Sequence, residues 1–121
     1  MTRAVGIDLV EIARFARVRQ RRPRVIERVF TPAEIEYCLA RQNQNASFAV
    51  RFAAKEAVIK LLGSTEGIAW SDIEILMNAT GQPEVRLRRE AERRAEDLKI
   101  RSIVLSLSHS RYYAVAVAVA D

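Results

Sequence analysis

The chain has 121 residues, of which 50% are hydrophobic and 29% are charged, and its formal net charge is +5. This length and composition fit one folded domain over residues 1–121 and exclude a disordered chain. A single cysteine, no signal-peptide pattern and no apolar run long enough to cross a bilayer exclude a disulfide-stapled secreted domain and a membrane protein, so we expect a cytoplasmic protein.

The first apolar run, residues 5–10, predicts a β-strand that leads into a helix near Glu11. It contains one carboxylate, Asp8, and a charge within a strand is disfavoured unless it has a partner or a ligand. Aspartate is also a good N-cap residue, so Asp8 could cap the helix that follows. Both interpretations stay open on these residues alone.

The helix that starts near Glu11 is rich in arginine, and Pro23 is expected to end or restart it. Residues 11–28 contain seven arginines and two glutamates. This excess of like charge has no evident structural gain, so it indicates a surface for an acidic partner: nucleic acid, anionic lipid or an acidic protein. If the helix axis continues, five of the arginines share one side: Arg14, Arg17, Arg21, Arg24 and Arg28.

Two further helices are predicted in the first half of the chain. Thr31 and Glu34 form a capping box with Pro32 at the first helical position, and this helix should end near Ala40. After a polar loop over 41–46, residues 48–63 predict a helix of about four turns that is closed by a glycine. This helix is apolar most of the way round and is therefore expected to be buried.

The charges on this long helix need a physical reason. Glu56 and Lys60 are four residues apart, in the order that favours an ion pair. Lys55 points into the apolar arc of the helix, although its stem could run along that surface to water. A structural ion pair and a functional site fit this pattern equally well.

The second half predicts an antiparallel sheet. Strands are expected over 72–78, 84–87, 102–108 and 112–120, with a charged surface helix over 89–98. In the last strand alanines alternate with valines, and a face of alanines lets a packed helix or a neighbouring subunit approach closely. The fold class is therefore α+β, an antiparallel sheet packed against the long central helix.

Motifs spread over nearly the full length are similar to one family, the holo-acyl-carrier-protein synthases, the small trimeric branch of the 4'-phosphopantetheinyl transferases. Asp8 together with the Lys-Glu-Ala-x-x-Lys pattern is the most specific combination. The motifs are Gly-Ile-Asp-Leu-Val-Glu-Ile at 6–12, Phe-Thr-Pro-Ala-Glu at 30–34, Arg-Phe-Ala-Ala-Lys-Glu-Ala-Val-Ile-Lys at 51–60, Trp-Ser-Asp-Ile-Glu-Ile at 70–75, Gly-Gln-Pro at 81–83 and Leu-Ser-Leu-Ser-His-Ser at 105–110.

The resemblance implies that the phosphopantetheine arm of coenzyme A is transferred to a serine of apo acyl carrier protein, releasing adenosine 3',5'-bisphosphate, in support of fatty acid biosynthesis. It implies that Asp8 and Glu56 hold Mg²⁺ together with the pyrophosphate of coenzyme A, which suits a cation that takes carboxylate, phosphate and water oxygens. Glu56 and Lys60 would be catalytic: Glu56, directly or through a metal-bound water, as the base for the serine hydroxyl, and Lys60 as a second cation.

The resemblance also implies the binding surfaces. Coenzyme A would contact Lys55, Lys60, Gly63 and His109, and the five arginines on one side of the basic helix would dock the acidic carrier protein. The family assembles as a homotrimer with its sites between subunits, so Asp8 and Glu56 are expected to face each other across that boundary and the alanine face to lie at its centre. Residues 63–67 lack the second glycine of many family members and carry an acid, which puts a phosphate-loop role in doubt.

Two other classes of protein remain as alternatives. A small nucleic-acid-binding module would explain the basic stretch, but that stretch has Phe15 as its only aromatic residue and leaves Asp8 and Glu56 without a use. A structural oligomer would make Glu56 and Lys60 an interface ion pair. With these set aside, we expect coenzyme A and acyl carrier protein as partners, and neither nucleic acid nor membrane.

Overall fold

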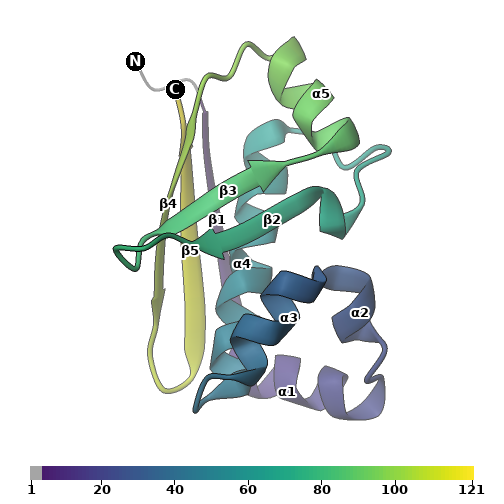
Figure 1. The fold of residues 1–121 in the computed structure, drawn as a ribbon, viewed down its shortest axis with the longest axis vertical. Helices are drawn as coiled ribbons and strands as arrows, with labels where there is room; N and C mark the ends of the chain where they lie inside the picture. The colour runs from purple at the N-terminus through teal and green to yellow at the C-terminus, as the bar shows by residue number, and fades with distance from the viewer. Residues whose placement is uncertain (1–3) are drawn as a thin grey trace.

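The computed structural model describes residues 4–121 and confirms the predicted α+β class. In Figure 1 the three short helices of residues 12–39 gather at the lower right, whereas the long helix of residues 44–62 runs beside the vertical strands on the left. The elements in chain order are β1 (Ala4–Glu11), α1 (Ile12–Arg21), α2 (Val25–Val29), α3 (Pro32–Leu39), α4 (Gln44–Leu62), the 3-10 helix η1 (Trp70–Asp72), β2 (Ile73–Met77), β3 (Pro83–Leu87), α5 (Arg89–Asp97), β4 (Ile103–His109) and β5 (Tyr113–Ala120).

The predicted single sheet is in fact two. β5 pairs antiparallel with β1 on one side and with β4 on the other, whereas β2 and β3 form a separate antiparallel hairpin. Figure 1 shows this hairpin crossing the direction of the three-stranded sheet. The sequence also predicts that the strand over 84–87 pairs antiparallel with the one over 72–78, and this is confirmed, but strand alternation does not show that the hairpin is separate from the other sheet.

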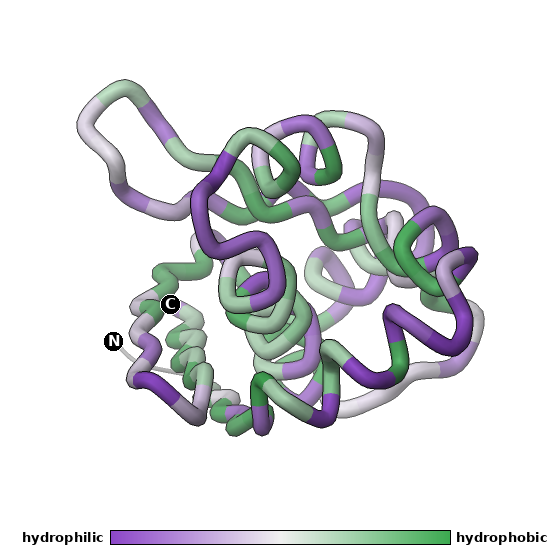
Figure 2. Tube along the Cα trace, turned by 90° about the horizontal axis from the view of Figure 1, so that it is seen from below, coloured by the Kyte–Doolittle hydropathy of each residue, from purple (hydrophilic) through white to green (hydrophobic). Residues whose placement is uncertain are grey.

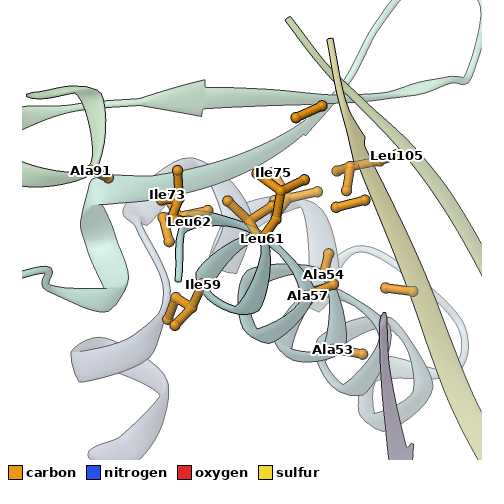
Figure 3. Packing of buried hydrophobic residues seen from close by; sticks show 14 of the residues in the cluster. Ala53, Ala54, Ala57, Ile59, Leu61, Leu62, Ile73, Ile75, Ala91 and Leu105 are labelled. Carbon is orange, nitrogen blue, oxygen red and sulfur yellow. The ribbon is translucent and has the colours of Figure 1, made fainter. Parts of the chain in front are cut away.

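The long helix α4 packs directly on the three-stranded sheet. The four alanines of β5 that face it are fully buried. On the neighbouring strand, a Cβ at Gly6 would lie only 1.8 Å from the backbone oxygen of Ala57, so the glycine is required for the close approach of β1 to α4. In Figure 3 the small residues Ala54 and Ala57 of α4 lie close to the strands.

This packing corrects the expectation for the alanine face of β5. α4 occupies that face, so it is not a contact with a neighbouring subunit. The valines of β5 lie on the opposite, outer face of the sheet, where they are half-buried.

Most helix boundaries follow the local signals. Thr31 and Glu34 make the predicted capping box, Pro23 separates α1 from α2, and Gly63 ends α4 with a φ of +74°. α4 starts earlier than predicted, at Gln44, because the Asn43 side chain accepts a hydrogen bond from the backbone N–H of Ala46 at 3.1 Å. The predicted polar loop is correspondingly shorter.

The core consists of two apolar clusters that share α4. One joins its C-terminal half to β2, α5 and the sheet, and the other joins its N-terminal half to α1, α2 and α3. Figure 2 shows the central helix end-on with mostly apolar colours, as predicted for a buried helix. Within residues 4–121, no helix is both long and apolar enough to span a membrane.

Candidate functional site

Asp8 lies within β1 on the face that packs against α4. Its backbone pairs with Ala116, and Glu11, not Asp8, occupies the N-cap position of α1. The interpretation of Asp8 as a helix cap is therefore wrong. Its carboxylate is 16% exposed and finds a partner on α4.

That partner is Lys60. Its Nζ lies 3.0 Å from Asp8 Oδ1 and donates a second hydrogen bond, of 2.9 Å, to the backbone oxygen of Ile7. The pattern predicted a pair between Lys60 and Glu56, but the ion pair seen in the structure crosses from α4 to β1. The Lys60 side chain is 54% exposed, so its ammonium is accessible to a ligand.

Glu56 lies one turn before Lys60 on α4 and is half-buried. Burial raises the pKa of its carboxyl above the ordinary value, the charge of Asp8 raises it further, and Lys60 opposes both effects. Among residues 4–121, the Glu56 carboxylate has no hydrogen-bond or ion-pair partner. β1 and α4 thus bring two carboxylates together within one chain, which corrects the expectation that they face each other across a subunit boundary.

Both carboxylates line a cavity of about 530 Å³. Phe15, Phe52 and residues of α2 form its apolar walls, and Arg14 from the basic helix contributes its one cationic side chain among the described residues. The cavity therefore combines acidic side chains with apolar walls, and it lies next to the arginine-rich surface of α1.

This donor set fits a hard divalent cation only together with a ligand. Within residues 4–121, no group of three or more acidic, histidine or cysteine side chains could hold a metal. Two carboxylates are, however, what Mg²⁺ commonly takes from a protein when phosphate oxygens and water complete its octahedral shell. The unpartnered Glu56 carboxylate beside a second anion is consistent with that use.

Lys55 is not available to a ligand, which contradicts its predicted contact with coenzyme A. Its side chain is fully buried, and its Nζ lies 2.8 Å from Glu34 Oε1. It also donates to the backbone oxygens of Ile73 at 2.5 Å and Trp70 at 3.1 Å. Burial lowers the pKa of Lys55, an effect that Glu34 counteracts. The stem does not run to water either.

His109 lies in a second cavity, of about 320 Å³, that sequence reasoning did not anticipate. Arg51 of α4 also lines it: its guanidinium lies 4.1 Å from the Tyr37 ring centroid and donates to Ser47, but its buried Nε has no partner. The sequence could have indicated Arg51 as a residue of this second cavity, because it is a charge on a helix that was predicted to be buried. Exposed Arg41 adds a further cation to this cavity.

Gly63 is not brought together with His109 in one chain. It lines a separate hollow with Lys60 and the loop residues Ser64, Thr65 and Glu66. Of the residues predicted to contact coenzyme A, Lys60 and Gly63 thus share one hollow and His109 lies in another.

The five arginines predicted to dock a partner are all exposed. Arg19, which the helical wheel excluded from that set, is used internally: it donates to Asn45 and Gln44 at 3.0 Å each and lies 4.8 Å from the Phe48 ring centroid. The basic surface therefore consists of exposed arginines, of which Arg17 also pairs with Glu11 at 3.6 Å.

The fold and the site define a class: an α+β domain in which two carboxylates and a lysine come together where a strand packs against a long central helix. The family model described as the 4'-phosphopantetheinyl transferase superfamily matches residues 4–118, and the chain belongs to this superfamily. The resemblance seen in the motifs is thereby confirmed.

More specifically, its relatives are holo-[acyl-carrier-protein] synthases. The chain is 50% identical to that of Moorella thermoacetica, covering 96% of this chain and 91% of the relative, and 46% identical to that of Chlamydia caviae, covering 98% and 96%. Among solved structures, the synthase of Neisseria meningitidis is 28% identical with a TM-score of 0.89, covering 100% and 99%. The Helicobacter pylori synthase in complex with coenzyme A is 32% identical with a TM-score of 0.82, covering 97% and 99%.

Proposed function

We propose that this protein is a holo-acyl-carrier-protein synthase, a single domain that transfers the 4'-phosphopantetheine group of coenzyme A to a serine of apo acyl carrier protein. The products are holo acyl carrier protein and adenosine 3',5'-bisphosphate, and the reaction supports fatty acid biosynthesis. The observation that carries the proposal is that Asp8 and Glu56 line one cavity, with Lys60 paired to Asp8, in a chain of this superfamily.

In the proposed reaction Asp8 and Glu56 hold Mg²⁺. When bound, the cation neutralises charge on the pyrophosphate and so favours departure of the nucleotide. Lys60 supplies a second positive charge for the departing phosphate, since its accessible ammonium already lies beside the Asp8 carboxylate. Glu56 accepts the serine proton, directly or through a water.

Coenzyme A is proposed to bind through Lys60 and Gly63, and through the cavity that contains His109. The unpartnered Nε of Arg51 supports an anionic group, such as a nucleotide phosphate, in that cavity. Arg51 and Glu56 are five residues apart on α4, about 140° around its axis. The two cavities thus open on different sides of the helix.

This separation supports sites that are completed by a neighbouring copy. A nucleotide held by the Arg51 cavity of one copy would reach the carboxylates of the next without passing around α4. We propose the homotrimer that the family resemblance implies, formed through the outer face of the three-stranded sheet, where Val5, Ile7, Leu9 and Val104 are exposed.

The acidic carrier protein is proposed to dock on Arg14, Arg17, Arg21, Arg24 and Arg28. Arg14 supports this placement because it lies both on the basic surface and in the cavity of the two carboxylates. A carrier protein on α1 would therefore present its serine next to Glu56.

One assay tests the proposed function: labelling of apo acyl carrier protein with a fluorescent coenzyme A, with and without Mg²⁺. We expect labelling that requires Mg²⁺ and falls by more than about 100-fold in Glu56→Gln, because a ligating carboxylate matters at least as much as the groups that support it. Glu36→Gln, an exposed change on α3, is the matched control and should keep full activity. Labelling without divalent cation, or full activity of Glu56→Gln at saturating Mg²⁺, would overturn the proposal.

A further inference from the structure

Lys55 and Glu34 form an ion pair at the centre of the molecule, and both side chains are fully buried. Neither is available to coenzyme A or to a carrier protein. Removing two charges from water is costly, and a buried pair of this kind is often no more stabilising than apolar residues of the same volume. The pair therefore calls for an explanation other than the stability of the core.

The pair joins three segments that are distant in sequence. Glu34 accepts hydrogen bonds of 2.8 Å from the backbone N–H of Thr31 at the start of α3 and from that of Ile75 in β2. Lys55 of α4 donates to the backbone oxygens of Trp70 and Ile73, on either side of the η1–β2 junction. Glu34 and Lys55 thus fix α3 and the η1–β2 segment to α4, one residue before Glu56.

An aromatic chain leads from this pair to the catalytic cavity. Lys55 donates a hydrogen bond to the backbone oxygen of Trp70. The centroid of the Trp70 ring lies 5.3 Å from that of the Phe52 ring. Phe52 in turn lies 5.9 Å from Phe15. Phe52 and Phe15 form the apolar wall of the cavity that contains Asp8 and Glu56, on its side toward α1. Trp70, which Lys55 binds through its backbone oxygen, therefore contacts the wall of that cavity through Phe52.

We propose that Lys55, held by Glu34, is a positioning residue for the carrier-protein side of the site. This inference rests on the proposed function. By fixing Trp70 and hence Phe52, Lys55 sets the apolar wall that lies between the basic surface of α1 and the carboxylate of Glu56. A docked carrier protein must meet this wall when it delivers its serine.

The coenzyme A side is predicted to depend much less on Lys55. Arg51 is held on its own helix by the backbone oxygen and the hydroxyl of Ser47, and on α3 by the Tyr37 ring. Lys60 is held by β1 through Asp8 and the backbone of Ile7. Loss of Lys55 should therefore change the Michaelis constant for one substrate more than for the other.

The experiment compares steady-state kinetics for both substrates in three variants of the full chain. Lys55→Met leaves Glu34 buried without its partner and is expected to fold less well. The double variant Glu34→Gln/Lys55→Met leaves no unpaired charge, so it should recover much of that stability while still lacking the bonds to Trp70 and Ile73. Leu105→Ala opens a cavity in the other core cluster and serves as a destabilised control.

In the double variant we expect the KM for apo acyl carrier protein to rise about three- to tenfold, the range of couplings through packed networks, while the KM for coenzyme A changes by less than about twofold. Leu105→Ala should lower the Tm without changing the ratio of the two KM values. An unchanged carrier-protein KM in the double variant, an equal rise for both substrates, or the same selective rise in Leu105→Ala would each overturn the inference. A wild-type protein that transfers nothing would instead overturn the proposed function, and this inference with it.

Discussion

At the scale of single residues, the Glu56 carboxyl ionises less readily than that of an exposed glutamate. Burial is the larger cause and the charge of Asp8 the second, and both raise its pKa above the ordinary value of 4.5. A group whose pKa is raised by folding stabilises the fold when it is protonated, below its unfolded pKa, and that contribution is lost as the pH rises through the folded pKa. At neutral pH the ionised Glu56 therefore destabilises the metal-free protein.

We accordingly predict that Glu56→Gln raises the Tm of the metal-free protein at about pH 7.5, because glutamine keeps the shape and removes the charge. The difference between variant and wild type should shrink as the pH falls through the raised pKa of the folded state and be gone below 4.5, where the wild-type carboxyl is protonated in the folded and unfolded chain alike. Thermal unfolding with a chelator across this pH range measures it. A variant that is less stable than the wild type at neutral pH would show that the attraction of Lys60 for the ionised Glu56 carboxylate exceeds the cost of its burial and the repulsion from Asp8.

The residues of the site differ in how far sequence could predict them. Asp8 and Glu56 are charges in segments that otherwise read as buried, and this local conflict marked both as candidates. The partner of Lys55 could not be predicted, because Glu34 also completes a capping box and that local role fully explained it. The unpartnered Nε of Arg51 likewise depends on tertiary packing.

At the scale of elements, local signals were enough for the helix ends and for the hairpin of β2 and β3, but not for the division into two sheets or the packing of elements. Thr31, Pro32 and Gly63 act within one turn of their own positions, so their effect was predictable from the sequence. Whether the alanine face of β5 meets a helix or a neighbouring subunit depends on the whole chain, and the structure resolves it in favour of α4. The fold class needed only the order of elements, which the sequence patterns predicted well.

The contact of β1 with α4 leads to a prediction for Gly6. In Gly6→Ala the new methyl would collide with the backbone oxygen of Ala57, which cannot rotate away as a side chain would. β1 must then move from α4, which separates Asp8 from Glu56 and Lys60. We expect destabilisation on the order of 3 kcal/mol, measured by chemical denaturation, and loss of transfer activity even well below the Tm.

Gly81→Ala is the matched control for this change. Gly81, unlike Gly6, has a positive φ, of +82°, and nothing lies within 4 Å of a Cβ added there. Its cost should be confined to backbone strain of about 1 kcal/mol, with activity retained. Full activity of Gly6→Ala would show that the site tolerates displacement of β1.

The basic helix α1 separates docking arginines from a structural one. Arg14 and Arg21 are exposed, so Arg14→Ala and Arg21→Ala should each lower kcat/KM for apo acyl carrier protein by roughly three- to tenfold at low salt, through slower association. The KM for coenzyme A should stay the same. Raising the salt concentration should reduce the difference from the wild type, since exposed charges are screened over about 10 Å at 0.1 M.

Arg19→Ala is the informative comparison on the same helix. Its guanidinium binds Asn45 and Gln44, so this variant should lose stability and show little selective change in carrier-protein kinetics. Equal kinetic effects in Arg19→Ala and Arg14→Ala would mean that total charge, and not the exposed side of α1, determines docking.

At the scale of the whole molecule, the two faces of the three-stranded sheet differ. The inner face is closed by α4, whereas the outer face carries the exposed apolar side chains of β1, the half-buried valines of β5 and Val104 of β4, with Ile7 57% and Val104 65% exposed. Exposed apolar patches of this kind mark association surfaces. The two cavities proposed to bind ligands lie on different sides of α4, and in the proposed assembly neighbouring copies would bring them together.

We therefore predict that Ile7→Glu disperses the proposed assembly and abolishes transfer while each chain stays folded. The side chain of Ile7 points away from α4, so the added charge meets only solvent in the isolated chain but would be buried without a partner in the assembly. Sedimentation should show the wild type as an oligomer and Ile7→Glu as a monomer, and the far-ultraviolet circular dichroism spectrum of the variant should be nearly unchanged.

Mixing Ile7→Glu with excess wild type should not restore the activity of the variant, because the face that carries the charge is the one needed for association. A monomeric variant with full activity would prove that one chain holds a complete site, and the separation of the two cavities would then need another explanation.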